Sequence, residues 1–506
     1  MRHQLFATKS LRQLLDEMAG ENRLRRVLGP IQLTSLGVGA IIGAGIFVAT
    51  GAAARNVAGP ALMVSYVVAG MTCVFAALCY AEFASMVPVA GSAYTYAYAT
   101  LGELFAWIIG WDLILEYAVG SATVANGWSG YFQSVLAKFG MHLPPALAGP
   151  PIIYDTAAGH FVQTAGVVNL PAVLIVALVT AVLVKGIQES AGFNTAMVFL
   201  KVTVVFFVIL VGAFYINPEN WKPFAPYGMS GLSFFGRPLM GEVNAGGQPV
   251  GMLAGAAIIF FAYIGFDSVS THAEEAKNPT RDVPIGIVAS LLICTVLYIA
   301  VVAVLTGMVK YDKLSVDAGV SDAFKQAGLP WAEFIIAAAG VAGITSVLLV
   351  LMLSAPRVFL AMARDGMVPS GFFGDVHPTF RTPWKSTILI GAFVIVMTGF
   401  LPIDALLHLT NIGTLFAFLI VCAAVLIMRR TNPDAKRPFR APFYPVVPIL
   451  GILSCLMLMF SLPVENWYRL IAWMALGLVI YFSYGYGHSE LRKRAEASAA
   501  GGARRG

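Results

Sequence analysis

Charged residues are what this sequence has least of. Only 11% of its 506 residues are charged, whereas 58% are hydrophobic and the mean hydropathy is +0.79. A soluble domain carries about 25% charged residues, so there is too little charge here to cover a surface exposed to water. These numbers exclude a multidomain soluble enzyme, a disordered chain and a collagen-like chain, and they indicate a polytopic membrane protein.

Cysteine, histidine and nucleotide-binding motifs are also scarce. No G-x-x-x-x-G-K-[ST] loop occurs and the seven histidines lie mostly in loops, so neither an ATP-driven pump nor a membrane enzyme is expected. No cofactor, metal site or disulfide is expected either, because every cysteine lies inside an apolar run and none has the spacing of a metal ligand. The cysteines are Cys73, Cys79, Cys294, Cys422 and Cys455.

Apolar runs that are long enough to cross a bilayer are frequent. A spanning helix needs about 20 predominantly apolar residues, and the chain therefore predicts an all-α membrane protein with about 12 transmembrane helices. Between the ninth and the tenth of these spans, Pro402 marks a very short turn. The candidate spans are 31–53, 60–86, 103–134, 166–185, 194–216, 250–273, 284–308, 332–362, 384–401, 403–428, 444–462 and 466–486.

The distribution of Lys and Arg predicts the orientation. With an even number of spans, 23 of the 32 Lys and Arg fall on the side of the termini, eight fall on the other side, and Lys201 lies within the fifth span. Cytoplasmic loops carry the excess of positive charge, so both termini are expected in the cytoplasm of a cell whose inner membrane holds the chain. The net charge of +6 then reflects basic loops and predicts no nucleic acid partner.

The ends of the chain are expected to lie outside the bilayer. Residues 1–30 form a polar cytoplasmic segment without the features of a cleaved signal peptide. Residues 489–506, rich in Ala, Gly, Arg and Ser, are expected to form a disordered cytoplasmic tail.

Two spans contain features that interrupt a membrane helix. The first has four glycines within Gly37–Gly45, and the sixth places Gly265 and Asp267 after Phe260–Ile264 in the middle of an apolar run. Inside a bilayer, unwound backbone is tolerated only where it lines a cavity or meets a ligand. The interruptions occupy corresponding positions in two possible five-helix halves, which is the pattern of a transporter built from inverted repeats.

Close helix packing through small residues is the alternative explanation. Gly39 and Gly43 lie four residues apart, as in a small-xxx-small face. An ion channel is a further alternative, but it needs a repeated filter or a ring of like charges. Two different interruptions in one chain favour a carrier.

The interruptions suit a zwitterion. An unwound turn at Gly43, Ala44 and Gly45 would leave amide groups at the start of a half-helix, where a carboxylate is stabilised. Carbonyl groups freed in the first and sixth spans can accept hydrogen bonds from an ammonium group, and glycine lets the backbone approach the ligand. We expect these carbonyls at Ile41, Phe261, Ala262 and Ile264.

Several motifs resemble the amino acid–polyamine–organocation superfamily, and within it the bacterial members of the cationic amino acid transporter family. The resemblance runs from about residue 20 to residue 485 in family order. It rests on Gly37–Phe47, Ala58–Ala61 with Ser65-Tyr66, Tyr80–Phe83, Pro88–Tyr94, Gly110–Tyr117, the sixth span with Ala273–Glu275 and Asn278-Pro279, and Pro356-Arg357 with Ala363–Gly366.

The resemblance implies a LeuT-like 5+5 inverted repeat with broken helices 1 and 6, and amino acid transport that is usually coupled to protons. It also implies that Gly43, Ala44 and Gly45 hold the substrate carboxylate, that carbonyls of the sixth span hold the amine, and that Phe261 closes over the substrate. The expected units are residues 31–216 and 217–428 for the two repeats, with an extracellular loop at 217–249, and residues 429–488 for helices 11 and 12.

Lys201 lies in the fifth span, about 10 Å from its start at the rise of 1.5 Å per residue. An ionisable group at this depth is a functional candidate. One interpretation is a lysine that reaches the headgroups. The other is a proton carrier, which the resemblance favours because some proton-coupled relatives have a lysine where sodium-coupled relatives bind an ion. Thr345 or Ser346 would then supply a hydroxyl group facing it.

Three acids inside the spans complete the candidates. Asp112 and Glu116 share a helical face at four-residue spacing, and Glu116 is a candidate for the proton path or the substrate vestibule. Asp267 follows the sixth-span interruption, where it would act in proton coupling, cap the resumed helix or bond another helix.

The expected function is a secondary active transporter of L-amino acids. The eighth-span stretch Val347–Met352 offers no polar group to a guanidinium, so neutral amino acids with proton symport are expected first, and arginine or lysine transport or exchange second. The expected partners are the amino acid, protons and the lipid bilayer. The sequence leaves open whether a small accessory membrane subunit exists.

Overall fold

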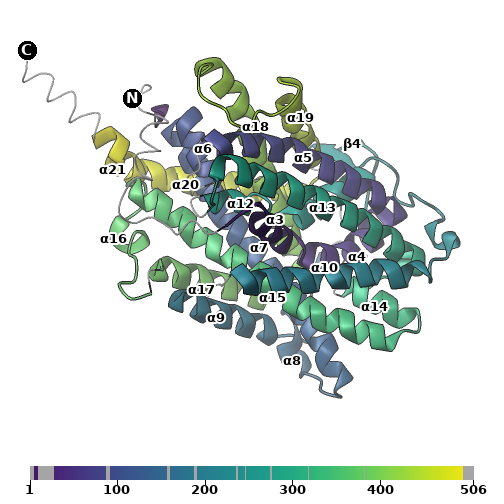
Figure 1. Cartoon of the computed structure of the whole chain (residues 1–506). Coiled ribbons are helices and arrows are strands. Elements are labelled where there is room, and N and C mark those ends of the chain that lie inside the picture. Colours follow the sequence, from purple (N-terminus) through teal and green to yellow (C-terminus); the bar gives the residue numbers. More distant parts are fainter. Residues whose placement is uncertain are drawn as a thin grey trace, which may run out of the picture.

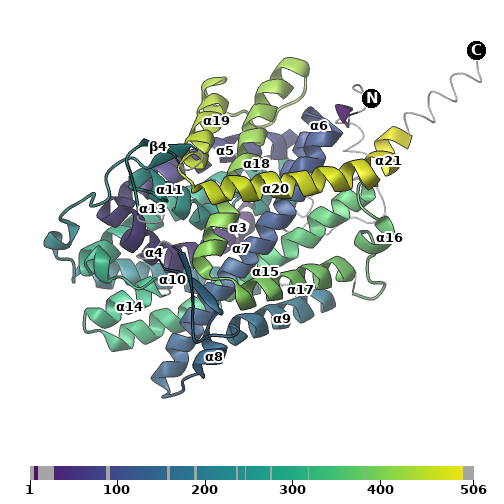
Figure 2. The same ribbon diagram turned by 180° about the vertical axis from the view of Figure 1, so that it is seen from behind.

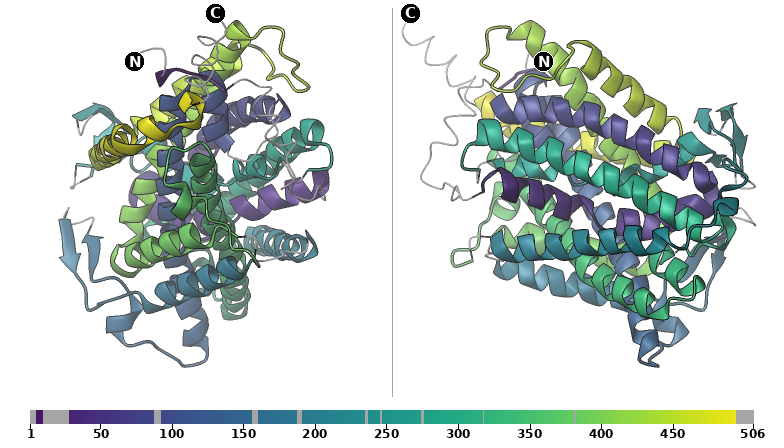
Figure 3. Two further views of the ribbon diagram at one scale, coloured as in Figure 1. Left: turned by 90° about the vertical axis from the view of Figure 1, so that its left-hand side faces the viewer. Right: turned by 45° about the vertical axis from the view of Figure 1, so that its right-hand side comes forward.

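The computed structural model describes residues 5–9, 28–86, 92–155, 160–186, 191–234, 237–244, 247–273, 276–316, 318–380 and 382–493. Four features of the sequence analysis lie outside these residues, namely Pro88–Gly91, Glu274-Glu275, most of the N-terminal segment and the tail from residue 494 onward. The described part is a bundle of helices with a common direction, most of which run the full depth of the molecule (Figures 1 and 3).

The helices match the predicted spans closely. Among the described residues, eight segments are long and apolar enough to cross a membrane. Three shorter apolar helices complete the set, since the first segment (Pro30–Met86) covers two predicted spans. The spanning helices are α3 (Pro30–Ile41), α4 (Thr50–Ala53), α5 (Leu62–Met86), α7 (Glu103–Lys138), α9 (Leu170–Lys185), α10 (Ala191–Ala213), α11 (Met252–Ile259), α12 (Ser268–Thr271), α13 (Pro279–Met308), α15 (Pro330–Arg364), α17 (Trp384–Phe400), α18 (Ile403–Thr431), α19 (Val446–Met459) and α20 (Val464–Ile480).

Short elements lie between and beside these helices. They are the helices α6 (Ser92–Thr100), α8 (Pro145–Ala148), α14 (Gly319–Gln326), α16 (Ser370–Phe373) and α21 (Tyr486–His488), the π-helical turns η1 (Gly45–Ala49), η2 (Ala54–Ala58) and η8 (Tyr481–Gly485), and the 3₁₀ turns η3 (Gly59–Ala61), η4 (Pro218–Trp221), η5 (Phe260–Tyr263) and η7 (Tyr311–Lys313).

Three antiparallel strand pairs are present among the described residues. These are β1 (Ile152–Asp155) with β2 (His160–Gln163), β3 (Leu232–Phe234) with β4 (Arg237–Met240), and β5 (Glu242–Val243) with β6 (Pro249–Val250). β3 to β6 belong to the loop predicted at 217–249 and extend to residue 250.

Proline and glycine set several of the helix boundaries. Pro30, Pro279 and Pro330 occupy the first turn of α3, α13 and α15, where a missing N–H costs nothing. Between the first two spans, Gly59 adopts a φ of +62° and is followed by Pro60, so the chain reverses sharply. Pro402 separates α17 from α18, as predicted.

The interior is formed by helices that are distant in sequence. α7 packs against α15 and α18, α13 packs against α5 and α3, and α10 contacts α3, α13 and α15. α3 therefore lies in the middle of the bundle, whereas α9 and α17 lie side by side at its edge (Figure 1) and α20 crosses the back (Figure 2). Exposed apolar side chains such as Leu174, Leu178 and Phe206 face outward from α9 and α10, as expected in lipid.

The described N-terminal and C-terminal segments meet at one end of the bundle. Lys9 donates a hydrogen bond of 2.5 Å to Asp365 at the end of α15, and the amide of Glu490 donates to the carbonyl of the same residue. This placement agrees with an even number of spans.

Candidate functional site

The first span is broken near its middle. α3 ends at Ile41, Ile42 has an extended backbone with a ψ of 106°, and the chain bends at Ile42 and Gly43. Ala44 is already in the helical region and η1 follows it. The break therefore lies at Ile42 and Gly43, slightly before the predicted turn at Gly43, Ala44 and Gly45.

The sixth span is broken over a longer stretch. α11 ends at Ile259, η5 follows as a 3₁₀ turn, and Ile264 has a ψ of 131°. Gly265 has a φ of +122°, a conformation that only glycine adopts readily. α12 then begins at Ser268, so the stretch that departs from the α-helix includes the predicted residues Phe261, Ala262 and Ile264. The Phe261 carbonyl, however, accepts a hydrogen bond of 3.2 Å from the Ile264 amide.

The two breaks pack against each other through their glycines. A Cβ atom on Gly45 would lie 2.2 Å from the Cα of Ala262, and one on Gly265 would lie 2.9 Å from the carbonyl carbon of Ala40. Backbone therefore meets backbone where the two spans lose their helical hydrogen bonds. The structure thus brings together Gly45 and Ala262, both predicted as site residues.

The last carbonyls of α3 have partners from other helices. A helix leaves its final four C=O groups without intrahelical donors. Here the carbonyl of Gly39 accepts a hydrogen bond of 2.6 Å from Lys201 Nζ, and that of Ile41 accepts one of 2.7 Å from the Tyr298 hydroxyl. The Ile41 carbonyl, which the sequence analysis expected to be freed for an ammonium group, is thus already bonded to α13.

Lys201 is buried between helices. Its side chain is 1% exposed, and a Cβ atom on Gly343 of α15 would lie 3.3 Å from its Cγ. Its ammonium group points to the C-terminal end of α3, where a positive charge is favoured by the helix dipole. The two hydroxyl groups predicted to face Lys201 form other bonds. Thr345 donates to the Val341 carbonyl, and Ser346 donates to the Gly343 carbonyl.

Asp267 does not cap the resumed helix, contrary to one expectation. In the part of the chain that the structure describes, no side-chain capping hydrogen bond is present at α12. Its carboxylate instead accepts a hydrogen bond of 2.8 Å from the Tyr117 hydroxyl on α7 and one of 3.2 Å from the Gly265 amide. The acid therefore holds the left-handed turn at Gly265 and ties it to α7.

Asp112 and Glu116 share a buried face of α7, as predicted. Their exposed fractions are 1% and 3%, and a Cβ atom on Gly413 of α18 would lie 2.8 Å from Asp112 Oδ1. Within the described structure, Asp112 Oδ2 and both carboxyl oxygens of Glu116 have no hydrogen-bond partner. Buried polar groups in this state are uncommon and mark this face as a functional candidate.

Three tyrosines form an aromatic side of the site that the sequence did not indicate. Tyr66, Tyr263 and Tyr298 come from α5, η5 and α13, and their ring centroids lie 5.6–6.1 Å apart. The Tyr263 hydroxyl donates to the carbonyl of Tyr66, and the Tyr66 hydroxyl bonds Thr50 Oγ1 at 2.7 Å. Tyrosine in an apolar run carries no spacing signal that would reveal this cluster.

Asn411 was also missed. It lies on α18, is fully buried, and its Nδ2 donates to the carbonyls of Ala257 and Ile258 at 2.9 and 2.8 Å. These bonds satisfy carbonyl groups at the end of α11, directly before the sixth-span break. The signal available in the sequence was an amide side chain inside a span. Burying an amide costs free energy unless it forms hydrogen bonds.

Comparison with known proteins identifies the family. A family model described as "Amino acid permease" matches residues 28–481. The chain belongs to the amino acid permease family. This agrees with the resemblance to the amino acid–polyamine–organocation superfamily.

Individual relatives of this permease match most of its length. It is 46% identical to the branched-chain amino acid permease BcaP of Bacillus subtilis (strain 168) over 97% of this chain and 100% of that protein. It is 45% identical to the methylthioribose transporter of the same organism over 97% and 99%. A vacuolar cationic amino acid transporter 4 of Arabidopsis thaliana is 37% identical over 82% of this permease and 65% of the relative.

Proposed function

We propose that this permease carries neutral L-amino acids across the cell membrane in symport with protons. The observation that carries the proposal is the pair of broken helices whose backbones meet at Gly45 and Ala262. Peptide groups released from helical hydrogen bonds in a bilayer need a partner, and a zwitterion supplies a carboxylate for amides and an ammonium group for carbonyls.

The proposed substrate site follows from these breaks. Amides at Gly43, Ala44 and Gly45 bind the carboxylate, and the carbonyls of Phe261, Ala262 and Ile264 bind the amine together with that of Ile41. Phe261, which is 5% exposed, covers the substrate. Branched-chain amino acids are the preferred cargo. The buried apolar side chain of Val347, whose Cγ2 would lie 2.5 Å from a Cβ atom on Gly43, and the name of the BcaP relative support this preference.

The proposed mechanism is alternating access in a LeuT-like arrangement of two inverted five-helix repeats, at residues 31–216 and 217–428, with both termini in the cytoplasm. Lys201 carries the coupling proton, since its ammonium group donates to the Gly39 carbonyl at the end of α3 and the neutral amine left after proton loss would bind that carbonyl more weakly. Glu116 and Asp267 take part in the proton path because both are buried acids, and Asp267 bonds Gly265 in the sixth-span break.

A ligand screen tests the substrate. Each of the twenty amino acids and methylthioribose is added to the detergent-purified protein, and the melting temperature is measured. Stabilisation follows RT ln(1 + [L]/Kd), so leucine, isoleucine and valine should raise the melting temperature most. A larger shift with arginine or lysine would favour a cationic amino acid transporter, and a shift with methylthioribose alone would contradict a zwitterion site.

Transport in proteoliposomes tests the mechanism. Labelled leucine should accumulate by counterflow against unlabelled leucine inside, because only a carrier exchanges label against a gradient. An inward proton gradient should drive uptake further. Passive flux without counterflow would indicate an ion channel or pore instead.

A further inference from the structure

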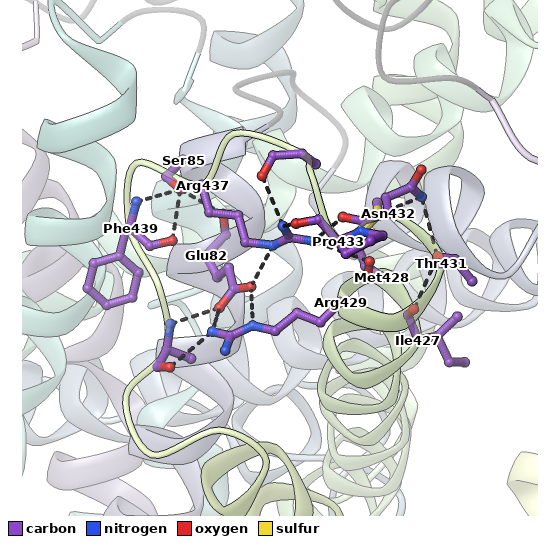
Figure 4. A network of polar contacts seen from close by, with 12 residues as sticks. Glu82, Ser85, Ile427, Met428, Arg429, Thr431, Asn432, Pro433, Arg437 and Phe439 are labelled. Carbon is purple, nitrogen blue, oxygen red and sulfur yellow. Dashed lines mark hydrogen bonds and ion pairs between the residues drawn. The ribbon is translucent and has the colours of Figure 1, made fainter.

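The loop between α18 and α19 is held firmly to the end of α5. Arg429 donates to both carboxylate oxygens of Glu82, at 2.9 and 2.5 Å, and the amide of Ala441 donates to the same carboxylate at 2.8 Å. Arg437 forms an ion pair of 3.5 Å with Glu82. Figure 4 shows these side chains converging from α5, the end of α18 and the loop.

Arg437 also caps the C-terminal end of α18. Arg437 donates to the carbonyls of Met428 and Asn432, at 3.2 and 2.6 Å, and also to those of Pro433 and Ala435, both at 2.9 Å. The last carbonyl groups of a helix need such donors. Two of the five cations of residues 429–440 therefore fix the loop, and they are directed inward.

The other three cations point away from the protein. Arg430, Lys436 and Arg440 are exposed, and no hydrogen bond or ion pair is present at their side chains within the described structure. The one acid of the loop is Asp434, which is also exposed. The outer face of a fixed loop thus carries an excess of positive charge.

The position of this loop relative to the bilayer follows from α19. Val446, Ile449, Leu450 and Leu453 are 40–57% exposed and recur at the spacing of one helical face, so they form the lipid-facing stripe of α19. Phe443 precedes this stripe, is 81% exposed and has a φ of +49°, a strained backbone for a bulky residue. A phenylalanine ring at the end of a lipid-facing stripe lies at the boundary between headgroups and acyl chains.

We propose that the outer face of this loop binds the headgroup of an anionic phospholipid, with Phe443 inserted beside its acyl chains. Arg430, Lys436 and Arg440 contact the phosphate. The loop lies at the end of the bundle that holds both described chain ends, which is the predicted cytoplasmic side, where anionic lipids attract basic segments. Binding there would hold Glu82, and with it α5, which packs against η5.

Lipid binding to the purified protein tests this proposal. The full chain in detergent is titrated with short-chain phosphatidylglycerol, with phosphatidylcholine of the same chain length, and with inorganic phosphate, and the melting temperature is recorded. Phosphatidylglycerol should stabilise the protein at low salt, and the effect should fall at high salt because the charges are screened.

Two variants identify the loop as the site. The triple variant Arg430→Gln, Lys436→Gln, Arg440→Gln should bind phosphatidylglycerol on the order of a hundredfold more weakly, since each basic residue contributes about fivefold. The control Lys310→Gln, Lys313→Gln, Lys325→Gln removes three exposed cations near η7 and α14 and should leave binding unchanged. Phe443→Ser should weaken binding of the lipid and leave any response to phosphate unaltered.

Several outcomes would overturn the proposal. These are equal stabilisation by phosphatidylcholine, an equal loss in the control variant, and a phosphate response as large as that of the lipid, which would indicate a small-anion site. If the triple variant does not elute as a single species in size-exclusion chromatography, the proposal is judged from two other results. These are the binding of lipid to Phe443→Ser and the comparison of the two lipids in the unaltered chain. The readout is lipid binding, so it does not depend on the proposed amino acid substrate.

Discussion

Lys201 Nζ and the carbonyl oxygen of Gly39 lie 2.6 Å apart, so a charge on the fifth span is bonded to the end of the first half-helix. This hydrogen bond is charge-assisted while the side chain is protonated, and the neutral amine would bind the Gly39 carbonyl more weakly. A single side chain therefore connects proton binding to the first break.

Lys201→Ala should abolish uptake driven by a proton gradient while leaving part of the substrate binding. The substitution removes the donor to Gly39 and the group that would carry the proton, but it leaves both breaks in place. Uptake of leucine by proteoliposomes with and without a pH gradient checks this expectation. The shift of the melting temperature on adding leucine measures substrate binding. Lys185→Ala, at the exposed end of α9, is the matched control. Undiminished proton-driven uptake in Lys201→Ala would contradict the role of the lysine.

Glu116→Gln should fold normally and change the response of uptake to pH. Both carboxyl oxygens lack a hydrogen-bond partner in the described structure, so a neutral side chain of the same shape loses little stability. The initial rate of leucine uptake as a function of external pH is the measurement. Glu465→Gln, exposed at the start of α20, should keep the original profile, and an unchanged profile in Glu116→Gln would remove this acid from the proton path.

Tyr298→Phe should bind amino acid substrates more tightly, by about two- to tenfold, if the substrate amine uses the Ile41 carbonyl. A hydrogen bond is worth about 0.5–1.5 kcal/mol. In the variant, the substrate amine does not have to displace the hydrogen bond that the Tyr298 hydroxyl donates to the Ile41 carbonyl. Binding of leucine is compared with that of the corresponding acid without an amino group. Tyr263→Phe, whose hydroxyl bonds Tyr66 instead, serves as the control. Equal effects on both ligands would show that Ile41 does not receive the amine.

Gly45→Ala should destabilise the protein by about 1–3 kcal/mol, the usual cost of forcing extra atoms into a packed interior. The new Cβ would lie 2.2 Å from a backbone atom of Ala262, which cannot move aside as a flexible side chain can. Thermal unfolding in detergent measures the loss. Gly371→Ala, where no atom lies within 4 Å of the new Cβ, should melt like the original chain, and equal melting of both variants would mean that the breaks are not tightly packed.

Glu82→Gln should lower the free energy of unfolding by about 3 kcal/mol or more, because it leaves two arginines facing a neutral group in a buried site. The Glu82 side chain is 3% exposed and that of Arg437 is 4% exposed. Glu490→Gln removes an exposed ion pair with Lys493 and should cost less than about 1 kcal/mol. Similar melting temperatures for both variants would show that the α18–α19 loop is held by other contacts.

Hydropathy and the rules for backbone in lipid were enough to predict the spans and the two breaks. The predicted spans 60–86 and 384–401 differ by at most two residues at either end from α5 and α17, because the length of an apolar run directly limits a membrane helix. The break near Gly43 and that before Asp267 were also visible, since glycine clusters and acids are unfavourable inside a continuous membrane helix.

The partners of individual groups were decided by tertiary packing. The sequence places Ile41, Asp267 and Glu82 at the ends of helical segments, but it does not indicate that Tyr298, Tyr117 and Arg429 reach them. Each of these contacts joins residues more than 140 positions apart, and their geometry depends on how the helices cross. Local pattern therefore determined where the helices form and break, whereas the packing of distant helices determined which polar atoms remain available for a ligand.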